Sequence, residues 1–463
     1  MMKQYLAKLL IQKFATKKKE NSTTLTKRIN GRYAGVKKSS KLDQQETKLL
    51  FDNTASLWDL KNKTINKIKQ FFGLFTVIKF NNVECNATNW AGTWQGACLS
   101  SIECTQQAGL AMGNCANGYG VCCVFRGTCG DWSKRNCTYF KSPNYPDYYP
   151  SDGGVALPTT TMASPTPDPR KHWYQWFGDF GRQMDDSDAT LCKFQIYKAN
   201  ENVQQFRIDF IDLDLTGPIN GTCLDERLII MGQNSNDQIP VICGYNTGQH
   251  VYVDVSELNG PLQIMVLSNS ASRKRFKIKI CQYTDSCYTS QSNCLQYFTG
   301  TTGIIQSFNY DQAAMFNRST PGYFNNLNYA ICIRREAGYC TITFTNSANM
   351  QVYPFQMVNQ LPDGQSTVPA GQAGVDVLNC PDDYVIIDGI RLCGDRFNDG
   401  STQMDFTMDA PVTGNGNIKS ILCNYFNILT DTSTGPIVIN VRTNGNVTGL
   451  GFKLFYIQNP CPN

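Results

Sequence analysis

The residue types that most often carry catalysis are scarce in this chain. Only two histidines occur, His172 and His250, and no Gly-Asp-Ser-Gly-Gly or Gly-x-Ser-x-Gly segment accompanies either, so a serine-protease triad is not expected. The absence of a His-Glu-x-x-His stretch excludes that class of zinc protease. His250 precedes a β-type run and is interpreted as a structural residue. We therefore predict that the protein is not an enzyme and has no catalytic residues.

Cysteine is the remaining reactive side chain, and all 20 cysteines lie between Cys85 and Cys461. This density is typical of an oxidising compartment, in which cysteines form disulfides. The same part of the chain carries five Asn-x-Ser/Thr sequons, which are predicted glycosylation sites: Asn86, Asn136, Asn220, Asn317 and Asn446. Together these features predict a secreted, extracellular glycoprotein.

Six of the cysteines cluster at the start of this region, namely Cys85, Cys98, Cys104, Cys115, Cys122 and Cys123. So short a segment cannot bury enough apolar surface to fold without cross-links such as disulfides. Zinc is the rival interpretation, but no pair has the Cys-x₂-Cys spacing of a zinc ribbon and no histidine lies near. We predict a small disulfide-rich module over residues 85–128, whose pairing the sequence leaves open.

Residues 1–84 differ from the rest in charge and contain no cysteine. They hold 18 Lys and Arg against 6 Asp and Glu, whereas the remainder holds 24 against 31. Such a leader is predicted to be disordered or a pro-segment, and the alternative is an arm that binds acidic polymers. A signal peptide is not evident from this start site, and the apolar run 71–78 is too short to span a bilayer. Neither a transmembrane segment nor a nucleic-acid partner is expected.

From Cys129 onward, apolar residues alternate with polar ones over short runs separated by Gly, Pro and Asn. The runs include residues 192–196, 206–210, 251–255, 262–266 and 276–280, and a second series includes 331–333, 342–344, 437–441 and 452–456. Period-two alternation is typical of half-buried strands in antiparallel sheets. The predicted fold class is all-β, with two successive β-sandwiches.

Several motifs in this part resemble the CUB domain family. In the first half these are Ser142-Pro143-Asn144-Tyr145-Pro146, Cys192-Lys193-Phe194-Gln195-Ile196, Phe206-Arg207-Ile208-Asp209-Phe210 and Cys243-Gly244. In the second half they are Ser307-Phe308-Asn309-Tyr310, Cys393-Gly394 and Thr448-Gly449-Leu450-Gly451-Phe452. The resemblance covers about residues 129–463. It implies two divergent CUB-type sandwiches, over 129–286 and 287–463, that bind partners and are not catalytic.

The resemblance also implies disulfides. In the first domain Cys223 should pair with Cys243, and Cys192 with Cys137 or, as the second choice, with Cys129. In the second domain the expected pairs are Cys294–Cys332 and Cys380–Cys393.

Many CUB domains hold calcium through three acids, and few of these positions are acidic here. In the first domain the positions fall on Thr216, on Glu226 with Asp225 beside it, and near Ser268 or Asn269. In the second domain they fall on Met350, Asp383 and Asn444. The calcium candidates are therefore Glu226, Asp225 and Asp383. Because calcium favours about six oxygen ligands, carboxylates among them, we expect no metal to bind and expect Glu226 and Asp383 to order loops. No cofactor is predicted.

A closer likeness is to secreted arthropod proteins in which a clip-like cysteine-rich segment precedes a CUB pair. It is carried by stretches such as 113–123, 240–244, 248–250 and 294–300. It implies an extracellular binding or assembly module.

An insertion over residues 151–188 separates the first two CUB-like motifs. Its second part contains the aromatic candidates for a binding loop, Trp173, Tyr174, Trp176 and Phe177. Aromatic side chains are enriched at binding hot spots, but they also serve as core that covers a sandwich edge.

The sequence thus predicts a non-catalytic, calcium-independent protein that binds an extracellular protein or glycan. One alternative is a structural or adhesive component of matrix or cuticle, with the basic leader bound to acidic polymers. Another is a clip-like docking partner of secreted proteases.

Overall fold

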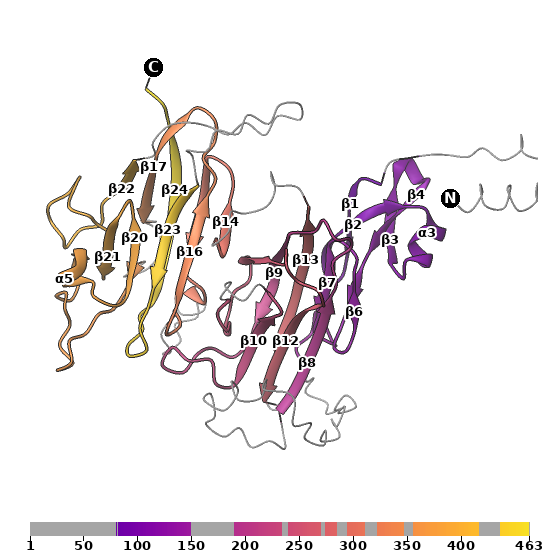
Figure 1. The fold of residues 1–463 in the computed structure, drawn as a ribbon, viewed down its shortest axis with the longest axis horizontal. Coiled ribbons are helices and arrows are strands. Elements are labelled where there is room, and N and C mark those ends of the chain that lie inside the picture. The colour runs from indigo at the N-terminus through magenta and orange to yellow at the C-terminus, as the bar shows by residue number, and fades with distance from the viewer. Residues whose placement is uncertain are drawn as a thin grey trace, which may run out of the picture. The chain divides into compact units, whose positions relative to one another are not determined.

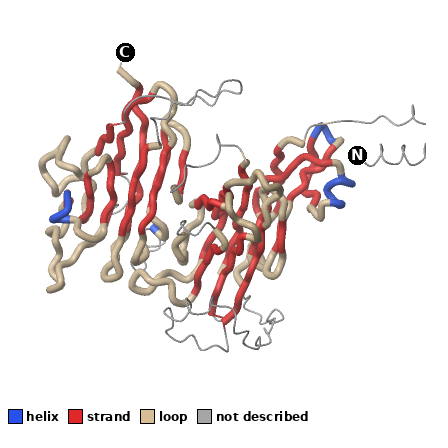
Figure 2. Tube along the Cα trace, in the orientation of Figure 1, coloured by secondary structure: helices blue, strands red, loops and turns tan. Residues whose placement is uncertain are grey.

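A computed structural model describes residues 80, 82–149, 189–233, 239–269, 274–284, 294–310, 322–346, 355–415 and 436–462. All of them belong to the compact unit Phe80–Asn463. Strands dominate in these residues, and the helices α3 (Ser101–Gln106) and α5 (Asp376–Asn379) are short (Figures 1 and 2). The predicted all-β class is confirmed. Across the described ranges, no helix is long and apolar enough to cross a membrane.

The cysteine-rich module is a four-stranded antiparallel sheet with the strand order β1-β2-β4-β3. Its elements are β1 (Glu84–Asn89), β2 (Gly92–Leu99), β3 (Leu110–Cys115), the 3₁₀ turn η1 (Ala116–Gly118) and β4 (Gly120–Val124). Helix α3 begins with a capping box, in which Ser100 Oγ accepts from Glu103 N and Glu103 Oε2 accepts from Ser100 N. Three disulfides stay inside the module: Cys85–Cys122, Cys98–Cys115 and Cys104–Cys123.

The first sandwich consists of two sheets, with the orders β10-β12-β8-β6 and β11-β9-β13-β7-β5. Their strands are β5 (Arg126–Gly127), β6 (Trp132–Ser133), β7 (Thr138–Lys141), β8 (Ala189–Ile196), β9 (Gln205–Asp214), β10 (Glu226–Met231), β11 (His250–Asp254), β12 (Leu262–Asn269) and β13 (Arg275–Tyr283). Neighbours are antiparallel except β5 with β7 and β6 with β8. The residues that alternate along β9, Phe206, Ile208 and Phe210, are fully buried between the sheets.

The second sandwich has the sheet orders β14-β16-β23-β20-β21-β19 and β15-β24-β17-β22, with β18 also paired to β24. Its strands are β14 (Gln296–Phe298), β15 (Thr302–Gln306), β16 (Asn328–Ile333), β17 (Tyr339–Asn346), β18 (Phe355–Gln356), β19 (Ala373–Val375), β20 (Tyr384–Ile387), β21 (Ile390–Gly394), β22 (Val412–Asn415), β23 (Ile437–Arg442) and β24 (Gly451–Pro460). Among the strands described here, β14 runs parallel to β16 and the other pairs are antiparallel. Alternating residues of β23 and β24, such as Ile439, Val441 and Leu454, are buried.

Each sandwich also contains disulfides of its own. The structure contains Cys223–Cys243, Cys294–Cys332 and Cys380–Cys393, as the family resemblance implied. It also contains Cys340–Cys461.

The preferred partner of Cys192 was wrong. Cys192 bonds to Cys129, the second choice, and Cys137 bonds to Cys281. The physical reason is strand placement. The segment after Cys129 continues into β6, which pairs with β8, the strand that carries Cys192. Cys137 directly precedes β7, which pairs with β13, the strand that carries Cys281.

A buried lysine joins the cysteine-rich module to the first sandwich. Lys277 of β13 is 2 % exposed, and its Nζ donates to the backbone oxygen of Thr93 at 2.9 Å. The same ammonium lies 3.7 Å from the ring centroid of Trp94, with Tyr139 and Tyr145 also near. Burial lowers the pKa of Lys277 to about 8, and the charge of Asp212 acts in the opposite direction. The aromatic faces also favour the charged form of the ammonium.

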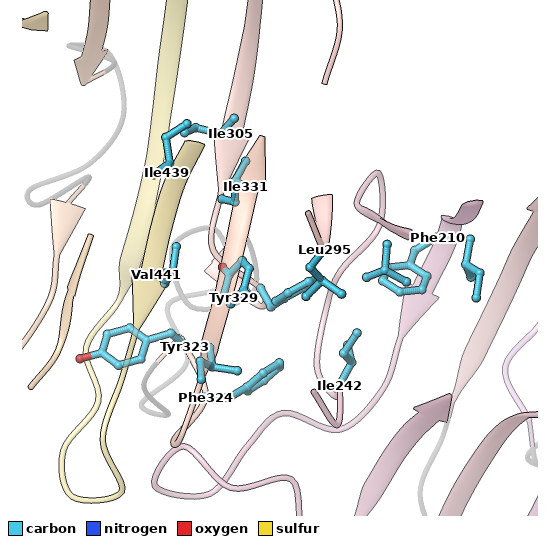
Figure 3. Packing of buried hydrophobic residues seen from close by; sticks show 14 of the residues in the cluster. Phe210, Ile242, Leu295, Ile305, Tyr323, Phe324, Tyr329, Ile331, Ile439 and Val441 are labelled. Atoms are coloured by element: carbon cyan, nitrogen blue, oxygen red, sulfur yellow. The ribbon is translucent and has the colours of Figure 1, made fainter. Parts of the chain in front are cut away.

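The two sandwiches are also in direct contact, through Leu295. Tyr252 N of β11 donates to Leu295 O at 2.8 Å, and Leu295 N donates to Ala330 O of β16 at 3.0 Å. Leu295 therefore hydrogen-bonds to both sandwiches. Its side chain lies between Tyr329 and Phe210 in the view of Figure 3.

Buried side-chain amides make further contacts where the two sandwiches meet, a region called the joint below. Asn246 Oδ1 accepts from Asn309 N at 2.7 Å, and Asn246 Nδ2 donates to Cys243 O at 2.7 Å. Gln249 Nε2 donates to Ser307 O at 3.2 Å, and Gln296 Nε2 donates to Gln249 Oε1 at 3.1 Å. Three of these bonds cross from the first sandwich to the second, and the bond from Asn246 to Cys243 O holds the amide in place within the first.

The variant Asn246→Ala should destabilise the fold. It leaves the buried groups Cys243 O and Asn309 N without their partner, and each such loss costs about 1–3 kcal/mol. We expect the free energy of unfolding, measured by urea denaturation, to fall by about 2–4 kcal/mol. The exposed Asn259→Ala is the matched control and should change stability by less than about 0.5 kcal/mol. Equal effects of the two substitutions would contradict a structural role for the joint.

Candidate functional site

Glu226, the buried acid among the candidate calcium positions of the first sandwich, belongs to an internal ion pair. Glu226 at the start of β10 is fully buried, and its Oε2 accepts from Thr216 N at 2.6 Å. Its Oε1 lies 3.8 Å from Nζ of Lys274, a lysine that is 1 % exposed. The Lys274 ammonium also lies 5.0 Å from the ring centroid of Tyr149. A side-chain cation therefore faces the carboxylate that was considered for calcium.

Burial acts on both members of this pair. It raises the pKa of Glu226 and lowers the pKa of Lys274, because a low dielectric disfavours either charge. The hydrogen bond from Thr216 and the neighbouring ammonium oppose this shift in Glu226. Asp225, next in the chain, is only partly exposed.

The corresponding acid of the second sandwich is also used within the fold. Asp383 is fully buried; its Oδ2 accepts from the Tyr323 hydroxyl at 2.8 Å and its Oδ1 from Asn444 N at 2.6 Å. The amide of Asn359 holds the Asp383 backbone, with Nδ2 donating to Asp383 O at 2.7 Å and Oδ1 accepting from Asp383 N at 2.9 Å. Asp383 thus orders the loops around it.

No cluster of three or more His, Cys, Asp or Glu side chains that could hold a metal ion is found in the described part of the chain. Thr216 N donates a hydrogen bond to Glu226, and Asn444 N donates one to Asp383. A backbone N–H group cannot ligate a cation. Ser268 is buried in β12, opposite Glu226 in the register of β10 and β12. Met350 lies outside the described residues.

His250 is a buried part of the joint between the sandwiches. Its Nε2 lies 2.9 Å from Tyr297 O and 3.2 Å from Tyr297 N, so one backbone residue provides both contacts. Burial lowers the pKa of His250 to about 3, with Arg207 acting in the same direction, so the ring is neutral at physiological pH. Its location agrees with the structural interpretation. His172 lies outside the described residues.

Four of the five predicted glycosylation sites can be located. Asn86, Asn136, Asn220 and Asn446 are exposed, which leaves room for a glycan at each. Asn317 lies outside the described residues. The binding-loop candidates Trp173, Tyr174, Trp176 and Phe177 also lie outside them, so their role remains a prediction.

Sequence analysis missed a groove of about 800 Å³ at one end of the first sandwich. Trp132 and Tyr197 line it together with Lys134, Lys198, Asn200 and Asn259. These residues come from β6, from the end of β8 and its following loop, and from the loop between β11 and β12. The only signal in the sequence was a tryptophan between Cys129 and Cys137. Its relation to Tyr197 depends on the pairing of β6 with β8.

Comparison with known proteins finds a family to which the second sandwich is similar. Residues 291–459 match the family model of the animal CUB domain. The second sandwich is therefore similar to animal CUB domains over these residues, and the likeness of the first sandwich to that family rests on its sequence motifs. No curated protein sequence matches this chain.

Three solved structures are similar at low identity. The CUB1-EGF-CUB2 domains of rat MASP-1 are 13% identical, with 70% of this chain and 99% of that chain covered and a TM-score of 0.21. The CUB1-EGF-CUB2 domain of human MASP-1/3 is 12% identical, with 70% and 100% covered and a TM-score of 0.20. The full extracellular region of zebrafish Gpr126/Adgrg6 is 11% identical, with 73% and 38% covered and a TM-score of 0.21. At these TM-scores the likeness supports no conclusion about function.

The variant Asp383→Asn should remove a pH dependence of stability. Burial raises the pKa of Asp383 from 3.8 to about 6, so the folded state binds a proton that the unfolded state releases between these values. The contribution of this group is complete below the unfolded pKa and is lost as the pH rises through the folded pKa. The free energy of unfolding of the wild type, relative to D383N, should therefore fall by up to about 3 kcal/mol between about pH 4 and pH 7.

Urea denaturation at several pH values measures this difference. Asp363→Asn, at an exposed position, controls for the loss of one carboxylate from the surface. A difference between wild type and D383N that is constant with pH would show that the Asp383 carboxyl is not perturbed by burial.

Proposed function

We propose that this chain is a secreted, non-catalytic binding protein that engages an extracellular protein or glycan through its sandwiches, without calcium. The observation that carries this proposal is the internal pairing of the acids at the loop ends. Glu226 accepts from Thr216 N and faces the Lys274 ammonium, and Asp383 accepts from Tyr323 and Asn444, so both carboxylates already interact with groups inside the fold.

An extracellular location is supported by the match to the animal CUB domain model and by the disulfides. Nine disulfides join cysteines of the described ranges, and no free cysteine is found in the same ranges. Such bonds persist in oxidising environments. CUB domains are generally binding modules, which supports a role in interaction.

Calcium independence is supported by charge as well as by ligand count. Calcium takes six to eight oxygen ligands, and each of these loop ends offers one buried acid. At Glu226 the nearest charge is already positive, so a divalent cation would meet the Lys274 ammonium. Two cations next to a single carboxylate repel each other strongly in a desolvated site.

The melting temperature should not respond to calcium. A ligand stabilises the folded state by RT ln(1 + [L]/Kd), about 2.7 kcal/mol at a hundredfold excess over Kd. The melting temperatures measured by differential scanning fluorimetry with about 2 mM calcium and with chelator should agree within about 1 °C. The reason is that one buried carboxylate at each loop end is too few oxygen ligands for tight calcium binding. Magnesium at the same concentration controls for ionic strength. A rise of several degrees that is specific to calcium would overturn calcium independence.

Binding to the partner should be saturable and should not need calcium. Fluorescently labelled full-length protein, titrated onto cells or matrix of its source tissue, should reach a plateau and be displaced by unlabelled protein. Chelator should leave the Kd unchanged, because no bound cation is required. Binding that never saturates and disappears in about 0.5 M NaCl would instead favour an adhesive role of the basic residues 1–84.

A further inference from the structure

The groove at the end of the first sandwich, called the Trp132 groove, has the features of a ligand site. Its volume of about 800 Å³ falls within the range of pockets that take small molecules. It is lined by side chains of three separate chain segments, around Trp132, around Lys198 and around Asn259. Unlike the joint and the loop-end acids, it is open to solvent.

The aromatic side chains of this groove are exposed but held in place. Trp132 is 65 % exposed and Tyr197 is 37 % exposed, although large aromatic rings usually bury most of their surface. Their ring centroids are 5.9 Å apart at an interplanar angle of 86°, an edge-to-face contact. The backbones are fixed as well, because Tyr197 N donates to Ser133 O at 2.8 Å. A fixed, exposed indole is prepared for contact with a ligand, since little conformational entropy remains to be lost.

Polar groups around the rings are mainly hydrogen-bond donors. Lys198 Nζ donates to Val255 O at 2.9 Å and to Ser256 O at 3.1 Å, which uses two of its three N–H groups. Asn200 Oδ1 accepts from Asn202 N at 2.9 Å, and its amide nitrogen makes no hydrogen bond to the described residues. Lys134 is exposed, and Asn259 adds another exposed amide. The groove therefore offers donors at several points around one aromatic surface.

The charges of the groove favour an anion. Two lysines, Lys134 and Lys198, and one acid, Glu201, are the ionisable residues with formal charge in its lining. The carbonyl partners of Lys198 orient its ammonium but do not neutralise it. A carboxylate or sulfate group between the two lysines would make charge-assisted hydrogen bonds.

We propose that the Trp132 groove binds an acidic saccharide, which rests on the proposed binding function and specifies its ligand class. A pyranose ring presents C–H bonds on its faces and hydroxyl groups around its edge. The Trp132 face would pack against the C–H bonds by dispersion. The amides of Asn200 and Asn259 would reach the hydroxyls, and Lys134 and Lys198 would meet the acidic group.

The tryptophans of this chain provide a test with several independent reporters. The full chain contains six: Trp58, Trp90, Trp94, Trp132, Trp173 and Trp176. Labelling with 5-fluorotryptophan, and assigning each ¹⁹F resonance by a Trp→Phe substitution, gives one signal for each position. The probes are short oligosaccharides of equal length from heparin, which carries sulfates and carboxylates, from hyaluronan, which carries carboxylates, and from chitin, which is neutral.

We expect the Trp132 resonance to shift saturably with one or both acidic probes and to stay in place with the neutral probe. The two acidic probes distinguish a sulfate from a carboxylate as the recognised group. Trp132→Ala should weaken binding at the groove at least about tenfold, as measured by calorimetric titration, because a central aromatic carries much of the binding energy. Trp90→Ala, at a tryptophan that is 81 % exposed outside the groove, is the matched control and should leave the Kd within about twofold.

Lys134→Met should weaken binding of the acidic probes while the melting temperature stays unchanged, because Lys134 is exposed and outside any ion pair of the described residues. Movement of the Trp58 resonance alone would place the saccharide on the basic leader and overturn the proposal. Movement of Trp173 and Trp176 alone, or an equal response to the neutral probe, would overturn it as well.

The outcome is separable from that of the proposed function. A silent Trp132 resonance together with saturable binding of the full chain to cells or matrix would reject the groove and leave the binding function standing. A responsive Trp132 resonance without such saturable binding would establish the saccharide site and reject the wider role.

Discussion

Buried polar side chains constrain this structure more than any other feature, because each needs a partner inside the fold. A charge or amide without water and without a partner costs more free energy than one hydrogen bond returns. Glu226 with Lys274, Asp383 with Tyr323 and Asn444, and the joint around Asn246 are local solutions to this constraint. The strands and disulfides that surround these groups must hold them within hydrogen-bond distance, so packing and polar pairing depend on each other.

The same constraint separates structural groups from groups that remain able to bind. By residue type alone Asp383 and Glu226 are candidate metal ligands, but Asp383 accepts two hydrogen bonds and Glu226 accepts one and faces the Lys274 ammonium. His250 looks like a candidate base, but its ring nitrogen contacts the Tyr297 backbone and its burial keeps it neutral. At the Trp132 groove, by contrast, an aromatic face and ammonium groups stay in contact with water. Recognition is therefore best supported where polar groups at the surface keep the capacity for a further hydrogen bond.

Sequence patterns predicted the strands because alternation is local: Phe206, Ile208 and Phe210 alternate in the sequence and are buried together in β9. They could not choose between Cys129 and Cys137 as the partner of Cys192, since that depends on which short strand reaches β8. The Trp132 groove was missed for the same reason, because it requires the parallel register of the two-residue strand β6. In the sequence, Lys277 has the position of an outward-facing strand residue. In the structure, the cysteine-rich module covers it. The features that the sequence did not predict all depend on contacts between residues far apart in the chain, and the periodicity of apolar residues carries no information about such contacts.

Two sources of positive charge act on an acidic polymer in different ways. Residues 1–84 carry 18 Lys and Arg against 6 Asp and Glu, an excess that attracts any polyanion over a distance set by salt. Such attraction raises encounter rates but discriminates poorly between polyanions of equal charge. Lys134 and Lys198 lie beside a fixed indole, so a ligand must match the shape of that surface as well as the charge. Salt should therefore weaken attraction to the leader more steeply than contact with the groove. Of these two sources of charge, the groove is the one suited to select between saccharides of equal charge.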